Sequence, residues 1–413
     1  MATLKQKDVW FRIGDQSNRT TVASTLVDIV PPADNIDFVE DFATEDLDTD
    51  HGASGTLFTV VTSKNFEKKR LNTYIYPTNV GYFLNGAVSR DATSGELTYK
   101  TVEKWWGSAL GGTEDKGIRF FGCLFDGFSL TIDRGGKSEP LQISMDCFVN
   151  AQKRILTGET APAKDWPKAA PYQSSGALID FVRDTGSGSY GPDDADVKRV
   201  SITFGNSASV EQIADNETDI DYDKVWTVHA PGEAKAQISV TCRITEDEYL
   251  RLGKAATPTI GAIRVALKHP KATSITTAST ITSGDNNDQT LNVSSTTGFL
   301  VGDVCVITHP TTGFTTLPIK TVNAGVSLVF DTDTGGGSGK DSRVTLNGSV
   351  DALTIRNMGV GIIFDAMTYK GRGSDVRDGA FRVVELRYEA KLSAGATKIV
   401  EVHAYNHSNA RIS

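Results

Sequence analysis

The chain has 413 residues, of which 39% are hydrophobic and 23% are charged, and its net charge is −9. This composition is typical of globular proteins with a sizeable core, and the length is that of two or three domains. The acidic balance disfavours a protein that grips nucleic acid, which needs clustered lysine and arginine, but it suits a surface along which DNA moves without binding.

The first part of the chain is predicted to consist of short strands. After an acidic N-terminal stretch, runs of strand length that are rich in β-branched and aromatic residues follow one another. They are 56–63, 73–77, 80–88, 96–102 and 119–125. Helical patterns are scarce, and 101–110 leaves room for a turn or two of helix. We therefore expect an all-β fold, mainly β with a few short helices.

Residues 128–148, "FSLTIDRGGKSEPLQISMDCF", predict a regular hairpin. Apolar residues stand at 128, 130 and 132 and again at 141, 143, 145 and 147, with mostly polar residues between them. This period of two is that of a strand pair with one buried face, and the glycine pair at 135–136 permits the chain reversal. Phe148 breaks the pattern because it stands on the polar face.

Residues 156–196 differ in composition and predict a linker. They are rich in Pro, Gly, Ser and Asp, as in "DTGSGSYGPDDAD", which is typical of inter-domain connectors. The short apolar run at 177–182 indicates that the linker docks against another part of the protein.

Part of the hairpin recurs downstream. The run "VSITFG" at 200–205 matches "FSLTID" at 128–133, and "AQISVTC" at 236–242 matches "LQISMDC" at 141–147. The shift is 72 residues for the first arm (128 to 200) and 95 for the second (141 to 236), so the second turn, 206–235, is the longer one. This predicts a duplicated β-domain. The alternative is that any two amphipathic strands look alike.

The remainder of the chain predicts one helix, more strands and an insertion. Residues 243–255 have the clearest helical pattern, with Thr245 and Glu248 at capping-box spacing, and 262–270 is strand-like. Residues 271–349 are dominated by Thr, Ser, Asn, Asp and Gly and contain few aromatics, which indicates a small inserted β-domain.

Four segments are therefore expected. They are a first β-sandwich domain at 1–155, the linker at 156–196, a second β-sandwich domain at 197–270 plus 350–413, and the inserted β-domain at 271–349.

No motif predicts catalysis, a metal or a cofactor. The run "GGGSGKDS" at 335–342 lacks the first glycine and the Ser or Thr of a phosphate loop, and "DLDTDHG" at 46–52 lacks the turn glycine of a calcium loop. The six histidines and the four cysteines have no zinc-site spacing. We expect a protein that is not an enzyme and binds no cofactor, although a site assembled from distant residues stays open.

The chain carries no targeting pattern. Its first residues lack the apolar region of a signal peptide, and no run reaches the roughly 18 apolar residues of a membrane span. Four cysteines in so long a chain fit a reducing compartment. We expect a protein that is made in a cytoplasm and has no membrane partner.

Four pieces of the chain carry a family resemblance. They are "FFGCLFDGFSLTID" with its partner "LQISMDCF", "VKRVSITFGNSASV", "AQISVTCRITEDEYLRL", and "LTIRNMGVGIIFDAMTYKGRG" with the closing strands. In their order along the chain and in their residue patterns they resemble the tail tube (major tail) proteins of long-tailed, non-contractile bacteriophages, in the two-domain form. The resemblance implies duplicated tail-tube β-sandwich domains, and the insertion resembles the decoration domains of some tail proteins.

The resemblance also implies a function. Tail tubes are rings stacked into a cylinder, assembled in the host cytoplasm, through which DNA passes without specific binding. Two domains per chain imply trimeric, pseudo-hexameric rings, with six chains per ring as the alternative. The implied partners are further copies of the chain, the tape measure protein, and tail terminator or distal tail proteins. A negative channel wall would let DNA slide because it repels the phosphate backbone.

Two features are candidates for contacts between subunits. The first is Phe148, the aromatic residue on the polar face of the hairpin. The second is the long turn at 206–235, which has seven acidic residues against two lysines and could equally be an ordinary surface loop. Its candidate residues are Glu211, Asp215, Glu217, Asp219, Asp221 and Asp223.

Two other classes of function compete with a tube subunit. A cell-surface or carbohydrate-binding β-protein would use the insertion as its binding module and would expose clustered aromatics, of which the insertion has only Phe299, Phe314 and Phe330. An enzyme such as a glycosidase would need a pair of carboxylates in a cleft. A tail-terminator or baseplate protein on the same fold is a further possibility.

Overall fold

The computed structural model describes most of the chain. The described residues are 10–18, 21–29, 43–47, 58–63, 69–89, 97–105, 117–134, 138–155, 159, 162–184, 190–192, 197–213, 223–224, 226–230, 232–243, 260–277, 290–310, 313–331, 352–373, 376–378, 381–392 and 398–412.

The protein is nearly all β, as predicted. The described residues contain two α-helices, α1 (Val80–Val88) and α3 (Asn409–Ile412), and a single 3-10 turn at Ser174–Gly176. All strand pairs in these residues are antiparallel, which short connections and alternating apolar and polar residues favour.

The first half of the main sheet surrounds one long strand, β7. Its seventeen residues pair with β6 and β9 at the start and with β8 and β12 at the end. The strands of this half are β1 (Trp10–Asp15), β2 (Val27–Ile29), β5 (Lys69–Tyr74), β6 (Lys100–Trp105), β7 (Gly117–Asp133), β8 (Gln142–Phe148) and β9 (Ala151–Ile155). Between β2 and β5 the chain forms a separate two-stranded sheet of β3 (Ala43–Leu47) and β4 (Phe58–Ser63).

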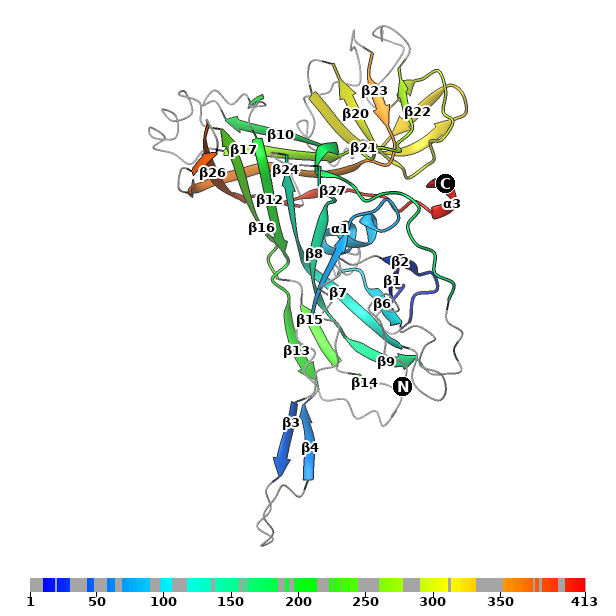
Figure 1. Ribbon diagram of the computed structural model, residues 1–413, viewed down its shortest axis with the longest axis vertical. Helices are drawn as coiled ribbons and strands as arrows, with labels where there is room; N and C mark the ends of the chain where they lie inside the picture. The colour runs from blue at the N-terminus through cyan, green and yellow to red at the C-terminus, as the bar shows by residue number, and fades with distance from the viewer. Residues whose placement is uncertain are drawn as a thin grey trace.

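The second half surrounds another long strand, β24 (Figure 1). Two of its strands, β10 and β11, lie within the predicted linker, where β10 pairs with β17 over its length. The strands are β10 (Ala177–Asp184), β11 (Tyr190–Pro192), β12 (Val197–Gly205), β14 (Asp223–Lys224), β16 (Lys235–Arg243), β17 (Ile260–Leu267), β24 (Val360–Arg372), β25 (Val376–Asp378), β26 (Phe381–Ala390) and β27 (Glu401–His403). A separate two-stranded sheet consists of β13 (Ser209–Ile213) and β15 (Trp226–Ala230).

The two halves repeat one topology. In chain order β1, β2, β5, β6, β7, β8 and β9 make the same pairs as β10, β11, β16, β17, β24, β26 and β27. Adding 244 to the residue numbers of β7 gives the equivalent residues of β24, for example 120 to 364 and 127 to 371. Each of these two strands has two bulges, and the bulges also fall at equivalent residues. Bulges are specific features of a sheet, so their agreement supports a true duplication.

The sequence similarity between 128–148 and 200–242 does not come from this duplication. The predicted correspondence of these two hairpins is therefore wrong. By these pairings the hairpin β7–β8 is equivalent to β24–β26. In the other hairpin β16 is equivalent to β5, and β12 has the same place in the chain order as the residues before β5. The similar hairpins lie next to each other about a local two-fold axis, since Leu130 pairs with Ile202, its own match in the sequence. Both hairpins also have one register, with Ile143 opposite Leu130 and Ile238 opposite Ile202. Their alternation is alike because both bury the same face against one core.

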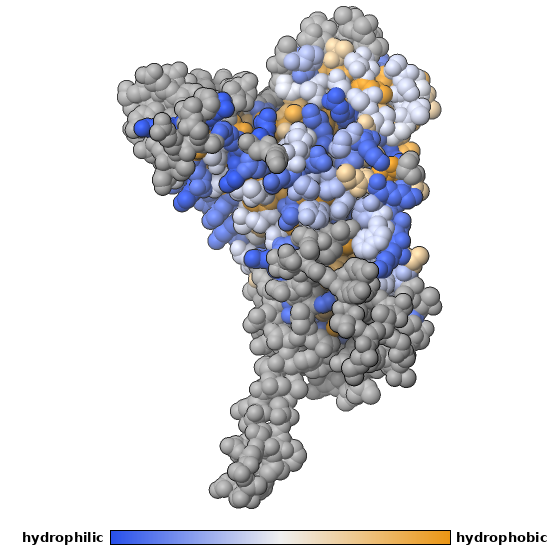
Figure 2. Space-filling view, viewed as in Figure 1, coloured by the Kyte–Doolittle hydropathy of each residue, from blue (hydrophilic) through white to orange (hydrophobic). Residues whose placement is uncertain are grey.

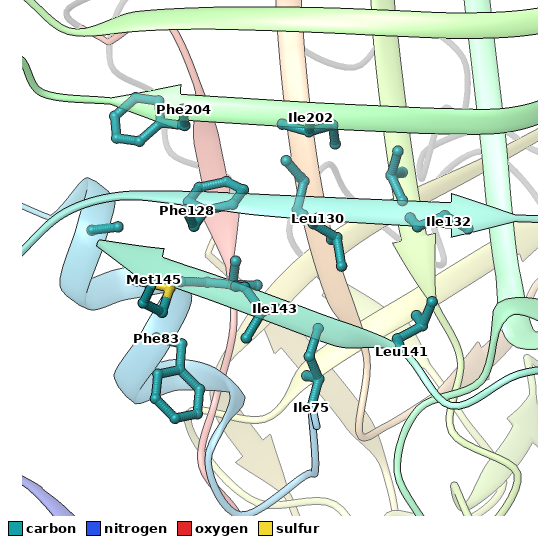
Figure 3. Packing of buried hydrophobic residues seen from close by; sticks show 14 of the residues in the cluster. Ile75, Phe83, Phe128, Leu130, Ile132, Leu141, Ile143, Met145, Ile202 and Phe204 are labelled. Atoms are coloured by element: carbon teal, nitrogen blue, oxygen red, sulfur yellow. The ribbon is translucent and has the colours of Figure 1, made fainter. Parts of the chain in front are cut away.

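One hydrophobic core spans both halves. It continues from β8 through β7 to β12, where Phe128 and Phe204 stack with ring centroids 5.6 Å apart (Figure 3). The apolar face of these strands is closed by α1, whose Phe83 packs on Phe125. The halves are therefore joined by continuous packing as well as by strand pairing.

Two local predictions are wrong. The run at 80–88 is a helix that is buried at all positions but Tyr82 and Asn85, which lie three residues apart on one face, although its aromatic and β-branched residues favoured a strand. Conversely, a turn of helix was expected within 101–110, but this run up to Trp105 belongs to the strand β6, which pairs with β1 on one edge and β7 on the other. The rest of that run, and 244–255 of the predicted helix at 243–255, lie outside the described residues.

The chain between β17 and β24 forms a separate sheet with its own hydrophobic core, at the top right of Figure 1. The chain enters and leaves it side by side, since Asn357 N–H donates to the Thr273 carbonyl at 3.2 Å. The first half has only residues 106–116 at the equivalent connection. The strands of this inserted unit are β18 (Ser274–Thr276), β19 (Thr290–Asn292), β20 (Val304–His309), β21 (Gly313–Asn323), β22 (Ser327–Phe330) and β23 (Thr354–Arg356).

The C-terminal segment ties the inserted unit to the main sheet. Arg411, on α3, forms a buried ion pair with Asp303 of the inserted unit and donates to the Gly298 carbonyl at 2.9 Å. His407 lies beside this pair, and burial lowers its pKa to about 4, so it is neutral at pH 7. Asn85 of α1 donates to the Ala404 carbonyl at 2.9 Å. The inserted unit is thus held at several points.

Candidate assembly surface

A broad polar face covers six adjacent strands in the order β5, β8, β7, β12, β16 and β26. It arises from the alternation of each strand, whose other face is buried in the core. Hydrophilic residues cover the flank of the molecule where Figure 1 places β12, β16 and β26 (Figure 2). We call these six strands the polar sheet.

The centre of the polar sheet is a ladder of hydroxyl groups across the β7–β12 junction. The Ser129 and Thr203 side-chain oxygens lie 3.4 Å apart, and those of Thr131 and Ser201 lie 3.1 Å apart. Cross-strand hydroxyl pairs of this kind stabilise a sheet modestly and leave an uncharged, hydrated surface. No charged side chain takes part in this ladder.

The carboxylates around this centre are paired with basic side chains. Arg70 lies 3.2 Å from Asp146, Arg387 lies 3.2 Å from Glu385, and Arg199 is paired with Asp133. Exposed pairs such as these contribute at most about 1 kcal/mol each, so their main effect is to balance charge. These three pairs bring opposite charges together on the described part of this face. The predicted negative channel wall stays a prediction.

Glu389, at the rim of the polar sheet, has the largest carboxylate shift on this face. The ammonium groups of Lys370 and Lys391 lie 2.5 Å and 3.0 Å from it, and hydrogen bonds from both lower its pKa to about 2. This carboxylate therefore stays ionised, with two cations beside it, at any pH near neutrality.

Phe148 lies at the end of β8, opposite Leu124 of β7. It is half-buried and shares the polar face with Gln142, Ser144 and Asp146, as the alternation predicts. It contacts neighbours within the chain, and its proposed contact with another subunit stays a prediction.

The acidic turn is only partly described. Glu211 lies in β13, which pairs with β15, and Asp223 lies in β14, which pairs with Gln152 of β9. The turn thus returns to the first half of the protein. Asp215, Glu217, Asp219 and Asp221 lie outside the described residues, so the structure does not bring the six candidates together into a site.

A cleft of about 620 Å³ opens beside the polar sheet. It is lined by the ends of β12, β16 and β26 together with residues 398–400, and it contains the carboxylates of Glu233 and Glu389. A glycosidase needs one carboxylic acid that keeps its proton near neutral pH. Glu389 cannot take that role because its pKa is lowered to about 2.

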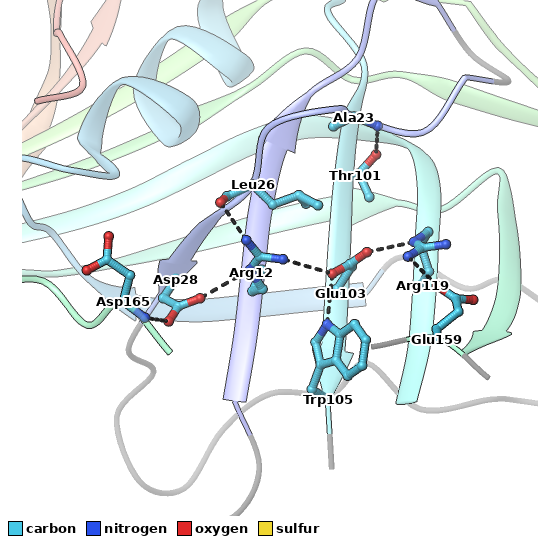
Figure 4. A network of polar contacts seen from close by, with 10 residues as sticks. All are labelled: Arg12, Ala23, Leu26, Asp28, Thr101, Glu103, Trp105, Arg119, Glu159 and Asp165. Carbon is cyan, nitrogen blue, oxygen red and sulfur yellow. Dashed lines mark hydrogen bonds and ion pairs between the residues drawn. The ribbon is translucent and has the colours of Figure 1, made fainter. Parts of the chain in front are cut away.

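A buried charge network in the first half went unnoticed in the sequence. The Glu103 carboxylate lies 2.6 Å from Arg119 and 3.7 Å from Arg12, and it accepts a hydrogen bond from the Trp105 indole at 2.8 Å (Figure 4). Arg12 continues the network to Asp28 at 3.2 Å. Residues 100–105 show no alternation of apolar and polar residues, so the sequence carried no signal for this network.

Glu103 is 1% exposed, so this network is internal to the sheet and is no binding surface. Its three central residues are cross-strand neighbours on β1, β6 and β7. Among the described residues, no group of three or more His, Cys, Asp or Glu side chains is placed to hold a metal ion. None of the described helices is long and apolar enough to cross a membrane.

No protein-family model matches the sequence, and no curated protein matches it. Function must therefore be argued from the fold and its surfaces.

Proposed function

We propose that this protein is a structural virion protein that assembles into stacked rings and forms the tail tube of a long-tailed, non-contractile bacteriophage. The observation that carries the proposal is the edge-to-edge joining of two topologically equivalent halves into one continuous sheet through β7 and β12. Natural proteins normally protect strand edges, so a repeated unit that continues its sheet into the next unit is suited to polymerisation.

Three chains would supply six copies of the repeated unit, so we propose trimeric, pseudo-hexameric rings, with six chains per ring as the alternative. Head-to-tail contacts close into a ring when the rotation per subunit divides a full turn. The tape measure protein and the tail terminator or distal tail proteins are the proposed partners, and the protein is proposed to act without catalysis or a cofactor.

In this proposal the polar sheet faces the channel. DNA passes into the host cell along hydroxyl groups and paired charges, which offer the phosphate backbone few unengaged cations. Specific or tight binding needs several unpaired lysines or arginines, and each such contact adds salt-dependent affinity. A surface whose charged side chains are paired lets DNA slide without strong attraction.

The carbohydrate-binding alternative is less well supported. It needs exposed aromatic side chains on the inserted unit, but Phe299, Phe314 and Phe330 are all buried in the described structure. The insertion, placed in a connection of the main sheet, suits a decoration carried by a tube wall.

Negative-stain electron microscopy of the purified protein tests the proposal. We expect rings or stacked tubes, with class averages of single rings that show three-fold symmetry and a six-fold outline. Six identical lobes from six chains would favour the alternative ring. A monodisperse monomer at every concentration, measured by size-exclusion chromatography with light scattering, would overturn the tube function.

A further inference from the structure

Three basic side chains from three parts of the molecule come together at one end of the main sheet. Arg134 follows the last residue of β7 in the first half, and Lys268 follows the last residue of β17 in the second half. Arg356 is the last residue of β23, where the chain leaves the inserted unit. We call these three residues the cation cluster.

Backbone hydrogen bonds join the segments that carry Arg134 and Lys268. Arg134 begins the connection from β7 to β8, and the Glu139 carbonyl of this connection accepts from the Ser174 N–H at 2.9 Å. Two residues further along the same 3-10 turn, the Gly176 carbonyl accepts from the Lys268 N–H at 3.0 Å. The turn therefore holds the end of β17 beside the connection from β7 to β8.

Strand pairing brings Arg356 to the same place. Leu267, the residue before Lys268, pairs with Val360 of β24, which lies four residues after Arg356. The charges are close enough to affect one another. The pKa of Lys268 is lowered, first by its partial burial and then by the positive charges of Arg356 and Arg134.

No carboxylate compensates the cation cluster. Within the described residues, Arg134, Lys268 and Arg356 form no ion pair, and Glu139 on the neighbouring connection pairs with none of them. The cluster differs in this respect from the polar sheet, where basic side chains lie beside carboxylates. Like charges held together without a counter-charge repel one another, so an anion that binds between them is stabilised by all three.

The neighbouring hydroxyl groups indicate which anion fits. The Ser138 and Ser175 side-chain oxygens lie 2.6 Å apart, both residues are exposed, and they belong to the two segments that link Arg134 to Lys268. Phosphate oxygens accept hydrogen bonds from guanidinium, ammonium and hydroxyl groups, and arginine can bind them through two parallel hydrogen bonds.

We propose that the cation cluster binds a phosphate group between Arg134, Lys268 and Arg356. The first half, the second half and the inserted unit each supply one cation, so the bound phosphate bridges all three parts. Because the unfolded chain does not keep the three cations together, phosphate binding stabilises the folded protein. Inorganic phosphate and the backbone of DNA both carry this group.

Isothermal titration calorimetry of the full chain with inorganic phosphate, at an ionic strength kept constant with chloride, tests the site. Lys268→Gln and Arg134→Gln each remove one cation of the cluster. Lys398→Gln is the matched control, since Lys398 is an exposed lysine of the cleft beside the polar sheet and forms no ion pair within the described residues.

We expect the wild type and Lys398→Gln to bind one phosphate per chain, and Lys268→Gln and Arg134→Gln to bind it at least tenfold more weakly. The absence of saturable binding to the wild type, or equal affinity in all four proteins, would overturn the proposal. A short DNA duplex added in competition identifies the source. Displacement of phosphate by the duplex supports a DNA-backbone site, and retention of phosphate supports a site for the free anion.

Thermal unfolding provides a readout that separates anion binding from a structural role of the cations. Arg134 is exposed, so Arg134→Gln removes a charge without leaving a cavity. In phosphate-free buffer of low ionic strength this variant is expected to melt no lower than the wild type, because one repelling charge is gone. It is also expected to lose most of the rise in melting temperature that phosphate gives the wild type. A lower melting temperature without phosphate, or an undiminished rise with it, would contradict the proposed site.

Discussion

Individual residues in this protein show how burial decides whether a charge matters for stability. The Glu103 carboxylate is enclosed between Arg12 and Arg119, whereas Glu385 on the polar sheet is half-exposed beside Arg387. Removing one partner of a buried group of charges leaves the others desolvated and uncompensated. An exposed pair loses little because water solvates both charges.

We therefore predict that Glu103→Gln lowers the free energy of unfolding by about 3 kcal/mol. The matched variant Glu385→Gln should lower it by at most about 1 kcal/mol. Urea denaturation of unassembled protein, followed by circular dichroism, measures both. Equal losses for the two variants would contradict a structural role for the buried network.

At the scale of elements, the junction of β7 and β12 determines how the two halves sit together. The bulge at Asp126 turns its carbonyl towards β12, where it accepts from the Asn206 backbone at 2.7 Å, and its carboxylate accepts from the Ala208 backbone at 2.9 Å. Asn206 also donates to the Ala87 carbonyl at 2.8 Å, which links the junction to α1.

Gly127 and Gly205 form a pair across this junction and provide a matched test. Gly127→Ala places a Cβ atom 2.1 Å from the Phe204 carbonyl, so we predict a loss of about 1–3 kcal/mol as the strands separate. Gly205→Ala meets nothing within 4 Å and should change stability by less than about 0.5 kcal/mol. The midpoints of urea denaturation compare the two variants. An equal effect of both would contradict the close approach of β7 and β12 at Gly127.

At the scale of the molecule, the inserted unit is an independent addition to a repeated sheet. It has its own core, and its entry and exit are hydrogen-bonded to each other. Its contacts with the main sheet include Phe314 and Val306 against Ala266, and the Arg411–Asp303 ion pair. The sheet that is proposed to form the ring lies outside it.

We predict that replacing residues 274–356 by a short Gly-Ser linker leaves tube formation intact and reduces the outer diameter of the tube. The remaining chain ends, Thr273 and Asn357, already lie within hydrogen-bonding distance, so closure needs no rearrangement. Electron microscopy with diameter measurement tests this. Loss of tubes from a variant that is still folded by circular dichroism would show that the insertion takes part in assembly.

Much of the fold could be predicted because it follows from local alternation. The amphipathic period of 128–148 and 200–242 places each side chain on the core or the polar face, and the composition of 271–349 marks the insertion. Local pattern failed at 80–88, where β-forming residues have helical spacing, and at 100–105, where a buried Glu concealed a strand.

The sequence by itself determined the all-β class and the faces of the strands, because these depend on neighbours one to four residues apart. Which strands are equivalent was decided only by the tertiary structure, since β7 and β24 correspond through pairings and bulges across 244 positions. Two hairpins that share one core can be similar in sequence without being equivalent.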